Sequence, residues 1–130
     1  MKQKYIIGDL VKYKVGGLEF IAEITNTSKY GYCFKGVSDD ISGTLCKEFA
    51  KDIPLTPEIL QKNGWEPTKE SLGHSFKNKK YTRFALWSIN DKWNFTIDGV
   101  MVCNTLSCLC YVHELQHLLF GLGLNSEMEV

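Results

Sequence analysis

The residues best suited to chemistry lie near the C-terminus, in the segment His113-Glu114-Leu115-Gln116-His117. This segment matches the pattern H-E-x-x-H, in which two histidines four residues apart lie on one side of a helix and hold Zn²⁺. In zinc peptidases the intervening glutamate activates a metal-bound water. In a zinc metallopeptidase, His113 and His117 would therefore be the metal ligands and Glu114 the catalytic base.

A third ligand and a cleft are the features that this motif lacks. The extended pattern H-E-x-x-H-x-x-G-x-x-H fails, because position 120 is Phe and position 123 is Gly. At about 100° per residue, His113, His117 and Phe120 gather on one side of the helix. The opposite side is apolar and is expected to face the core; it consists of Tyr111, Leu115, Leu118, Leu119 and Leu122. We therefore favour no catalytic residue and no metal ligand, and we expect the histidine side to face solvent or a partner.

A second zinc hypothesis adds the thiols that precede the histidines. Cys103, Cys108 and Cys110 lie shortly before His113, and thiolate with imidazole suits structural zinc. However, the spacing lacks the C-x-x-C pairs of typical zinc sites, and free cysteine is among the most buried residue types. We favour buried, reduced thiols and no cofactor.

A basic segment offers a second kind of binding site. Basic groups interleaved with aromatic rings can follow a phosphate backbone and stack on bases. Here the basic residues are Lys77, Lys79, Lys80 and Arg83, and the aromatic ones are Phe76, Tyr81, Phe84 and Trp87. The competing interpretation is a solvated strand end with its aromatic side chains in the core. Because 15 basic residues balance 15 acidic ones, a protein devoted to coating nucleic acid is disfavoured.

Composition places the chain among globular proteins. Hydrophobic residues make up 44% and charged residues 23%. The apolar stretch near the N-terminus, Tyr5-Ile6-Ile7, is too short for a secretion signal, and no segment has the roughly 18 apolar residues of a membrane span. With an odd count of five cysteines, the sequence predicts a cytoplasmic protein that does not enter membranes.

Residues 1–53 predict short antiparallel strands. The glycine pair Gly16-Gly17 is a hairpin signal between the first two of them. Short strands joined by tight turns are typical of small barrels and curled sheets. We predict a β-rich, SH3-like module, either a small closed barrel or an open curled sheet. Its expected strands are residues 9–14, 18–25, 30–35 and 42–49.

Residues 54–130 predict an α+β lobe. Thr56 and Pro57 are suited to begin a short linking helix and Asn63-Gly64 to end it. A polar surface connection over residues 66–73 is expected next, followed by an antiparallel sheet and a C-terminal helix. The later elements expected are strands at 81–89, 93–97 and 100–103, a helix at 111–122 and a final short strand at 127–130. The chain is thus predicted to be α+β, with two lobes or one continuous domain.

Three segments resemble a known group of proteins. They are Gly8-Asp9-Leu10-Val11, the segment Pro54-Leu55-Thr56-Pro57-Glu58-Ile59-Leu60, and Tyr111-Val112-His113-Glu114-Leu115-Gln116. In type and order they resemble an uncharacterised family of small proteins of gut-bacterial (Bacteroidales-type) phages and mobile elements. The resemblance implies a phage or mobile-element origin and brings no established activity or catalytic residue.

The function that these observations favour is non-enzymatic binding. The expected partner is a host or phage protein that contacts the exposed side of the C-terminal helix at His113, His117 and Phe120. A second copy of the chain is an alternative partner. Nucleic-acid binding through Lys77, Lys79, Lys80 and Arg83 and zinc-dependent hydrolysis through the H-E-x-x-H segment are the alternative functions.

Overall fold

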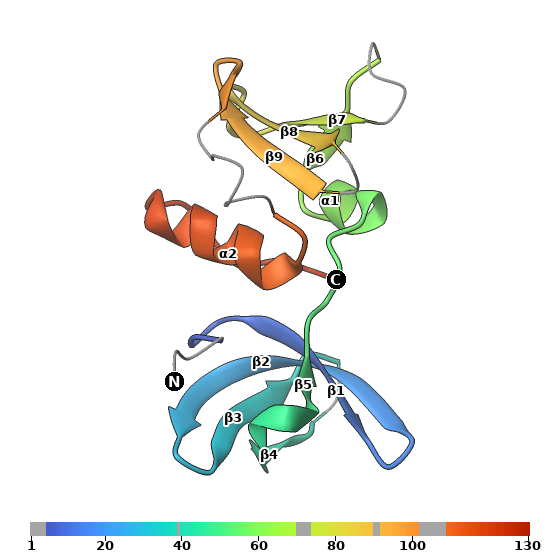
Figure 1. Ribbon diagram of the computed structural model, residues 1–130, viewed down its shortest axis with the longest axis vertical. Coiled ribbons are helices and arrows are strands. Elements are labelled where there is room, and N and C mark those ends of the chain that lie inside the picture. Colours follow the sequence, from blue (N-terminus) through green and yellow to red (C-terminus); the bar gives the residue numbers. More distant parts are fainter. Residues whose placement is uncertain (1–4, 39, 70–73, 90–91, 102–108) are drawn as a thin grey trace. The chain divides into compact units, whose positions relative to one another are not determined.

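The computed structural model describes residues 5–38, 40–69, 74–89, 92–101 and 109–130 and divides into two compact units. Unit 1 contains the described residues of Met1–Ile53 together with Tyr111–Glu127. Unit 2 contains those of Pro54–Cys110 together with Met128–Val130. Within these ranges the structure has two antiparallel sheets and two α-helices, which agrees with the predicted α+β class (Figure 1).

The sheet of unit 1 has the order β4-β3-β2-β1-β5. Gly16 and Gly17 both have positive φ, as the predicted hairpin turn between β1 and β2 requires. A short 3₁₀ helix, η1 (Lys47–Phe49), turns the chain back so that β5 pairs with β1. The sheet is open in the described residues. Its strands are β1 (Leu10–Val15), β2 (Leu18–Ser28), β3 (Gly31–Gly36), β4 (Ser42–Leu45) and β5 (Ala50–Lys51).

An aromatic cluster fills the concave side of this sheet. Tyr13 lies 4.9 Å from Phe34 and 5.6 Å from Phe20, measured between ring centroids. The three side chains come from neighbouring strands and alternate with exposed residues, as a half-buried strand requires. Burial raises the pKa of the Tyr13 phenol to about 12. The other buried hydrophobic members of this core are Tyr5, Val11, Ala22, Ile24, Tyr32 and Ala50.

Helix α2 (Val112–Gly121) belongs to unit 1, although the sequence analysis assigned it to the lobe of residues 54–130. The chain re-enters unit 1 at Tyr111, and the Val112 amide donates to the Ile53 carbonyl at 2.8 Å. The helix then contacts β1. Side chains of α2 form hydrogen bonds with residues that are distant in the sequence, and these bonds hold the helix to unit 1. The periodicity of a helix does not reveal such partners.

Unit 2 begins with helix α1 (Pro57–Lys62), as predicted. The Thr56 hydroxyl accepts a hydrogen bond from the Ile59 amide at 3.3 Å. A sheet of order β10-β9-β8-β7-β6 follows, and the core contains Leu60, Trp65 and Phe95. Its strands are β6 (Trp65–Pro67), β7 (Ser75–Asn78), β8 (Phe84–Ile89), β9 (Lys92–Ile97) and β10 (Val100–Met101).

Two expectations for unit 2 are wrong. Part of the segment expected to be a surface connection forms β6, which pairs with β7 in register Trp65↔Asn78. The final segment is not a strand; instead, the Asn63 side chain binds the Glu129 backbone. The amide of Asn63 donates to the Glu129 carbonyl at 2.7 Å and accepts from its N–H at 2.8 Å. The Asn63 side chain thus makes the two backbone hydrogen bonds that a neighbouring strand would otherwise make.

Gly31 allows the close approach of β3 to the end of β4. A Cβ at this position would lie 1.9 Å from the Leu45 carbonyl oxygen. We expect Gly31→Ala to lower the free energy of unfolding by about 2–3 kcal/mol, because backbone must move to accommodate it. Urea unfolding followed by far-UV circular dichroism measures this.

Gly43→Ala is the matched control, since its added methyl would meet the Phe34 ring at 3.8 Å, an ordinary contact. Equal effects of the two substitutions would contradict the close approach.

Candidate functional site

The histidine side of α2 faces the N-terminal segment of unit 1. The expectation that His113 is exposed is wrong, because its exposed fraction is 6%. The apolar side is also buried at Leu115 and Leu119, so both sides of the helix are covered. The helical wheel assumed a single buried face, and it therefore assigned His113 to solvent and Tyr111 and Leu122, which are exposed, to the core.

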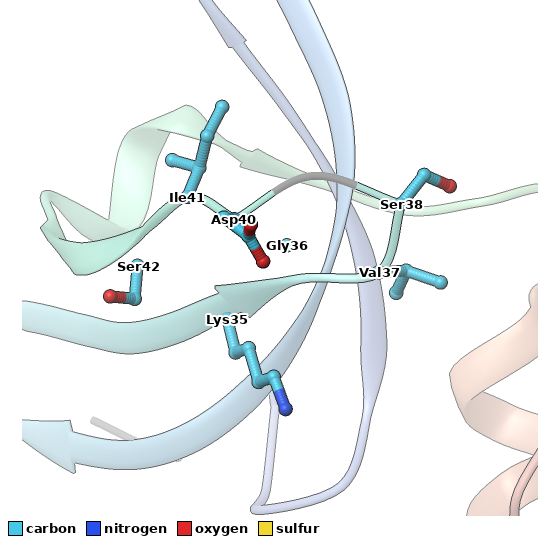
Figure 2. Close-up of a pocket in the computed structure, with 7 residues that line it drawn as sticks. All are labelled: Lys35, Gly36, Val37, Ser38, Asp40, Ile41 and Ser42. Carbon is cyan, nitrogen blue, oxygen red and sulfur yellow. The ribbon is translucent and has the colours of Figure 1, made fainter.

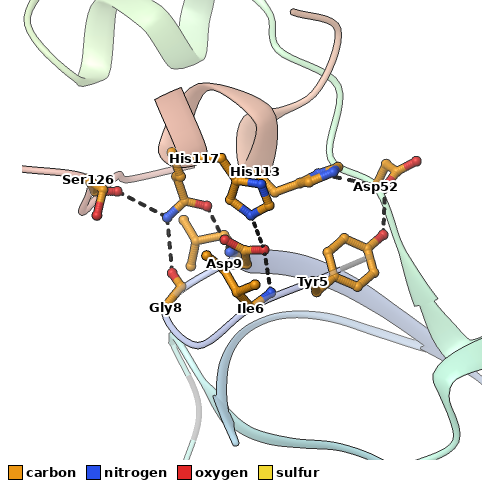
Figure 3. A network of polar contacts seen from close by, with 10 residues as sticks. Tyr5, Ile6, Gly8, Asp9, Asp52, His113, His117 and Ser126 are labelled. Atoms are coloured by element: carbon orange, nitrogen blue, oxygen red, sulfur yellow. Dashed lines mark hydrogen bonds and ion pairs between the residues drawn. The ribbon is translucent and has the colours of Figure 1, made fainter. Parts of the chain in front are cut away.

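His113 lies in a cluster of rings beside a carboxylate (Figure 3). Its ring contacts Tyr5 edge-on at 5.0 Å and His117 edge-on at 5.5 Å. Its Nδ1 lies 3.7 Å from Oδ1 of Asp52 and has no hydrogen-bond partner among the described residues. That same carboxylate oxygen accepts the Tyr5 hydroxyl proton at 2.6 Å. The same Asp52 oxygen thus lies beside both Tyr5 and His113.

The protonation states in this cluster follow from burial. Desolvation lowers the pKa of His113, and the nearby Asp52, Asp9 and Glu114 carboxylates oppose this effect without overcoming it. Desolvation also raises the pKa of Tyr5, and the hydrogen bond to Asp52 raises it further. Near neutral pH the site therefore contains a neutral imidazole and a neutral phenol.

His117 forms a second histidine–carboxylate pair. Its Nε2 lies 2.7 Å from Oδ2 of Asp9, a side chain that is almost wholly buried. The same oxygen accepts the Ile6 amide proton at 2.8 Å. Asp9 directly precedes β1. The His117–Asp9 pair therefore connects α2 to the start of the sheet. A buried carboxylate requires such partners, because an unpaired one is strongly destabilised.

Gln116 completes the connection and was not singled out from the sequence. Its Oε1 accepts the Leu10 amide proton at 2.9 Å, and its Nε2 donates to the Gly8 carbonyl at 3.0 Å and the Ser126 carbonyl at 3.1 Å. The side chain is buried. The available signal was a polar residue one helical turn from Val112 and Leu119, but two of its hydrogen-bond partners lie more than 100 residues away.

These contacts differ from those of a catalytic zinc helix. Nε2 of His117 is directed at Asp9, and Nδ1 of His113 is directed towards Asp52. Glu114 accepts the Tyr111 amide proton at 3.1 Å and so caps its own helix. In the described part of the chain, no three His, Cys, Asp or Glu side chains converge to hold a metal ion. The arrangement can support a helix against a sheet, and it brings no base to an attacking water.

An apolar surface lies directly over the His117–Asp9 pair. The exposed fractions are 65% for Ile7 and 68% for Phe120, and Ile6 is also exposed. Between these residues is a recess of about 20 Å³, whose walls include Gly8, Asp9, Gln116 and His117. We call Ile6, Ile7 and Phe120 the Ile7–Phe120 surface. It combines a predicted interface residue, Phe120, with two that the sequence analysis did not assign.

The basic segment of unit 2 is partly neutralised. Lys79 forms an ion pair with Glu66 at 3.1 Å, and the Arg83 guanidinium donates to both carboxylate oxygens of Asp98. Lys80 lies over the Tyr81 ring at 5.4 Å, and Lys77 is exposed. Among the aromatic residues, Phe76 is buried, whereas Trp87 is exposed. Two of the four basic side chains of the segment are therefore paired with carboxylates.

A second, larger recess lies at the turn between β3 and β4 (Figure 2). It has a volume of about 330 Å³ and is open to solvent. Of the described residues that line it, Lys35 and Asp40 are charged and none is aromatic or a histidine.

The thiol hypothesis falls mostly outside the described residues. Cys103 and Cys108 are not among them, and Cys110 is half-buried. Cys33 is half-buried and Cys46 is exposed.

Comparison with known proteins found no matching family model, no matching curated protein and no matching solved structure. Over the described ranges, no helix has the length and apolar character needed to cross a membrane.

Gln116→Leu should lower the free energy of unfolding by about 2–4 kcal/mol, because it leaves the buried Leu10 amide without its acceptor. Urea unfolding measures this. Gln61→Leu is the control, since Gln61 is exposed on α1 and its replacement should change stability by less than about 0.5 kcal/mol. A Gln116→Leu protein as stable as the control would contradict the role of Gln116.

The lowered pKa of His113 predicts a loss of stability in acid. An unfolded histidine titrates near pH ~6.5, so above this value both states are neutral and the stability is complete. As the pH falls below it, the unfolded state binds more protons, and the free energy of unfolding decreases by up to about 1.4 kcal/mol per pH unit. Urea unfolding between pH 7.5 and 5.5 tests this. The His113→Gln protein should lack this component, while His74→Gln, at an exposed position, should retain it.

Proposed function

We propose that this chain is a non-enzymatic protein-binding protein that contacts its partner through the Ile7–Phe120 surface. The observation that carries the proposal is the exposure of two large apolar side chains, Ile7 and Phe120, on adjoining segments that are joined beneath by side-chain hydrogen bonds. Exposed apolar side chains that gather on one surface are typical of protein contacts, whereas single ones are common everywhere. A fixed backbone beneath them reduces the entropy lost on binding.

The chemistry beneath the surface supports binding over catalysis. Asp9 and Glu114 are the carboxylates nearest the histidine motif, and each accepts a backbone N–H in addition to any other contact. Gln116 has three hydrogen bonds. These polar groups are engaged in holding α2 to the sheet, which is a scaffold for a contact surface.

We also propose that the sheet of unit 1 is an SH3-like module. Support comes from its antiparallel order β4-β3-β2-β1-β5 and from the 3₁₀ turn η1, which returns the last short strand to β1. Modules of this type commonly serve as binding domains, although a fold alone does not determine a function.

The partner proposed is a protein of a bacterial host or of the phage or mobile element, met in the cytoplasm. The resemblance of Gly8-Asp9-Leu10-Val11 and Tyr111-Val112-His113-Glu114-Leu115-Gln116 to phage-type proteins supports this origin. An accessory role on host machinery follows by analogy. Nucleic acid is the less favoured partner, because Arg83 and Lys79 are paired with acidic residues.

A tagged pull-down from a bacterial host lysate, treated with nuclease, tests the proposal. We expect a partner captured by the wild-type protein to be lost with Phe120→Asp, because the substitution places a charge in an apolar contact. Loss by about tenfold or more is expected for a central contact residue. The recovered partner is quantified by mass spectrometry.

Val100→Asp in unit 2 is the matched control, since the exposed fraction of Val100 is 69%, close to that of Phe120. The control should retain the partner. Capture that survives Phe120→Asp, or that disappears equally with Val100→Asp, would refute this surface. Light scattering of the purified protein shows whether the contact is instead with a second copy.

A further inference from the structure

The Ile7–Phe120 surface is composed of two pieces of chain that are far apart in the sequence. Ile6 and Ile7 belong to the segment before β1, whereas Phe120 lies on α2. The surface exists only while these pieces remain joined. Their connections include the His117–Asp9 contact and the hydrogen bonds of Gln116 to Gly8 and Leu10.

His113 occupies the buried end of this junction, one helical turn before His117. The titratable groups that face it come from every described element packed around it. They are Tyr5 from the N-terminal segment, Asp9 from the turn before β1, Asp52 from the segment after β5, and Tyr111, Glu114 and His117 from α2 itself. None of these groups donates or accepts a hydrogen bond at His113 Nδ1.

We propose that the junction between α2 and the N-terminal segment is an acid-operated switch, in which protonation of His113 separates the two halves of the Ile7–Phe120 surface and releases its partner. The proposal rests on the proposed function for its consequence, the release. The switch itself concerns only the contacts of unit 1.

The geometry explains why a proton on His113 would favour opening. The imidazolium would be a charge in a site that is almost closed to water, and its nearest carboxylate oxygen, on Asp52, lies 3.7 Å from Nδ1, beyond hydrogen-bond distance. A second imidazole, that of His117, lies 5.5 Å away and opposes an added positive charge. In agreement with this geometry, burial lowers the pKa of His113. Opening the junction admits water to the charge and thereby relieves the penalty.

The strands of unit 1 also have contacts that do not involve this junction. The aromatic core of Tyr13, Phe20 and Phe34 lies within the sheet, and its strands pair through backbone hydrogen bonds. We therefore expect a local opening at a pH where the sheet remains folded. Local opening of this kind is detected by hydrogen exchange.

Two amides of unit 1 report separately on the junction and on the sheet. The Leu10 amide donates to Gln116 Oε1, so it exchanges when α2 separates from β1. The Val37 amide donates to the Ile21 carbonyl at 3.0 Å and reports on the sheet. NMR-detected exchange on the full chain, expressed as protection factors, compares them from pH 7.5 to 5.0. We expect the protection factor of Leu10 to fall by up to about tenfold per pH unit below pH ~6.5 and to stay well below that of Val37, whose exchange requires the sheet to unfold.

Constant protection at Leu10, or equal protection factors at the two amides, which would mean that only global unfolding opens the junction, would overturn the switch. His113→Gln should remove the pH dependence at Leu10, and His74→Gln, at an exposed position in unit 2, should preserve it. Should His113→Gln not fold, the NMR titration of His113 in the wild-type protein decides: a midpoint below pH ~6.5 supports the proposal, and one at or above it refutes the proposal.

These measurements need no partner, so they stand apart from the proposed function. A switch found without any loss of partner in Phe120→Asp would refute the binding surface alone. Binding lost in Phe120→Asp, with Leu10 protection independent of pH, would refute the switch alone.

Discussion

The buried carboxylate of Asp9 is the constraint on which unit 1 depends. An almost fully buried aspartate must have partners, and it finds them in the Ile6 amide and in His117. Satisfying Asp9 therefore brings α2 to the start of β1. Gln116, one residue before His117, then satisfies backbone groups on both sides of Asp9. The position of the C-terminal helix thus follows from polar groups as much as from its apolar face.

This constraint changes the meaning of the H-E-x-x-H segment. Histidines four residues apart share one helix side, as zinc ligands would, but here that side is closed by the N-terminal segment. Each histidine is directed towards a different aspartate, and the glutamate caps the helix. The spacing of the two histidines shows only that they share one side of a helix. What the side faces depends on residues more than 100 positions away, such as Asp9.

Local signals in the sequence predicted most elements of the fold. The turn at Gly16-Gly17 and the helix beginning at Thr56 have local causes, namely positive φ and side-chain capping, and both are present. The site was predictable only in part: the exposure of Phe120 is confirmed, and that of His113 is wrong. Burial of His113 required Tyr5 and Asp52 to converge on it, and no local pattern encodes that convergence.

The same polar junction links stability to the proposed binding surface. An apolar junction would hold α2 equally well at any pH, because hydrophobic contacts carry no titrating group. Here the junction contains the imidazole of His113, whose Nδ1 has no hydrogen-bond partner among the described residues. It lies among a phenol, a second imidazole and two aspartates. Polar groups of this kind add specificity to a contact but leave it dependent on their protonation states. The exposed Ile7 and Phe120 lie over this junction, so under the proposed switch a partner bound to them would be released when His113 is protonated.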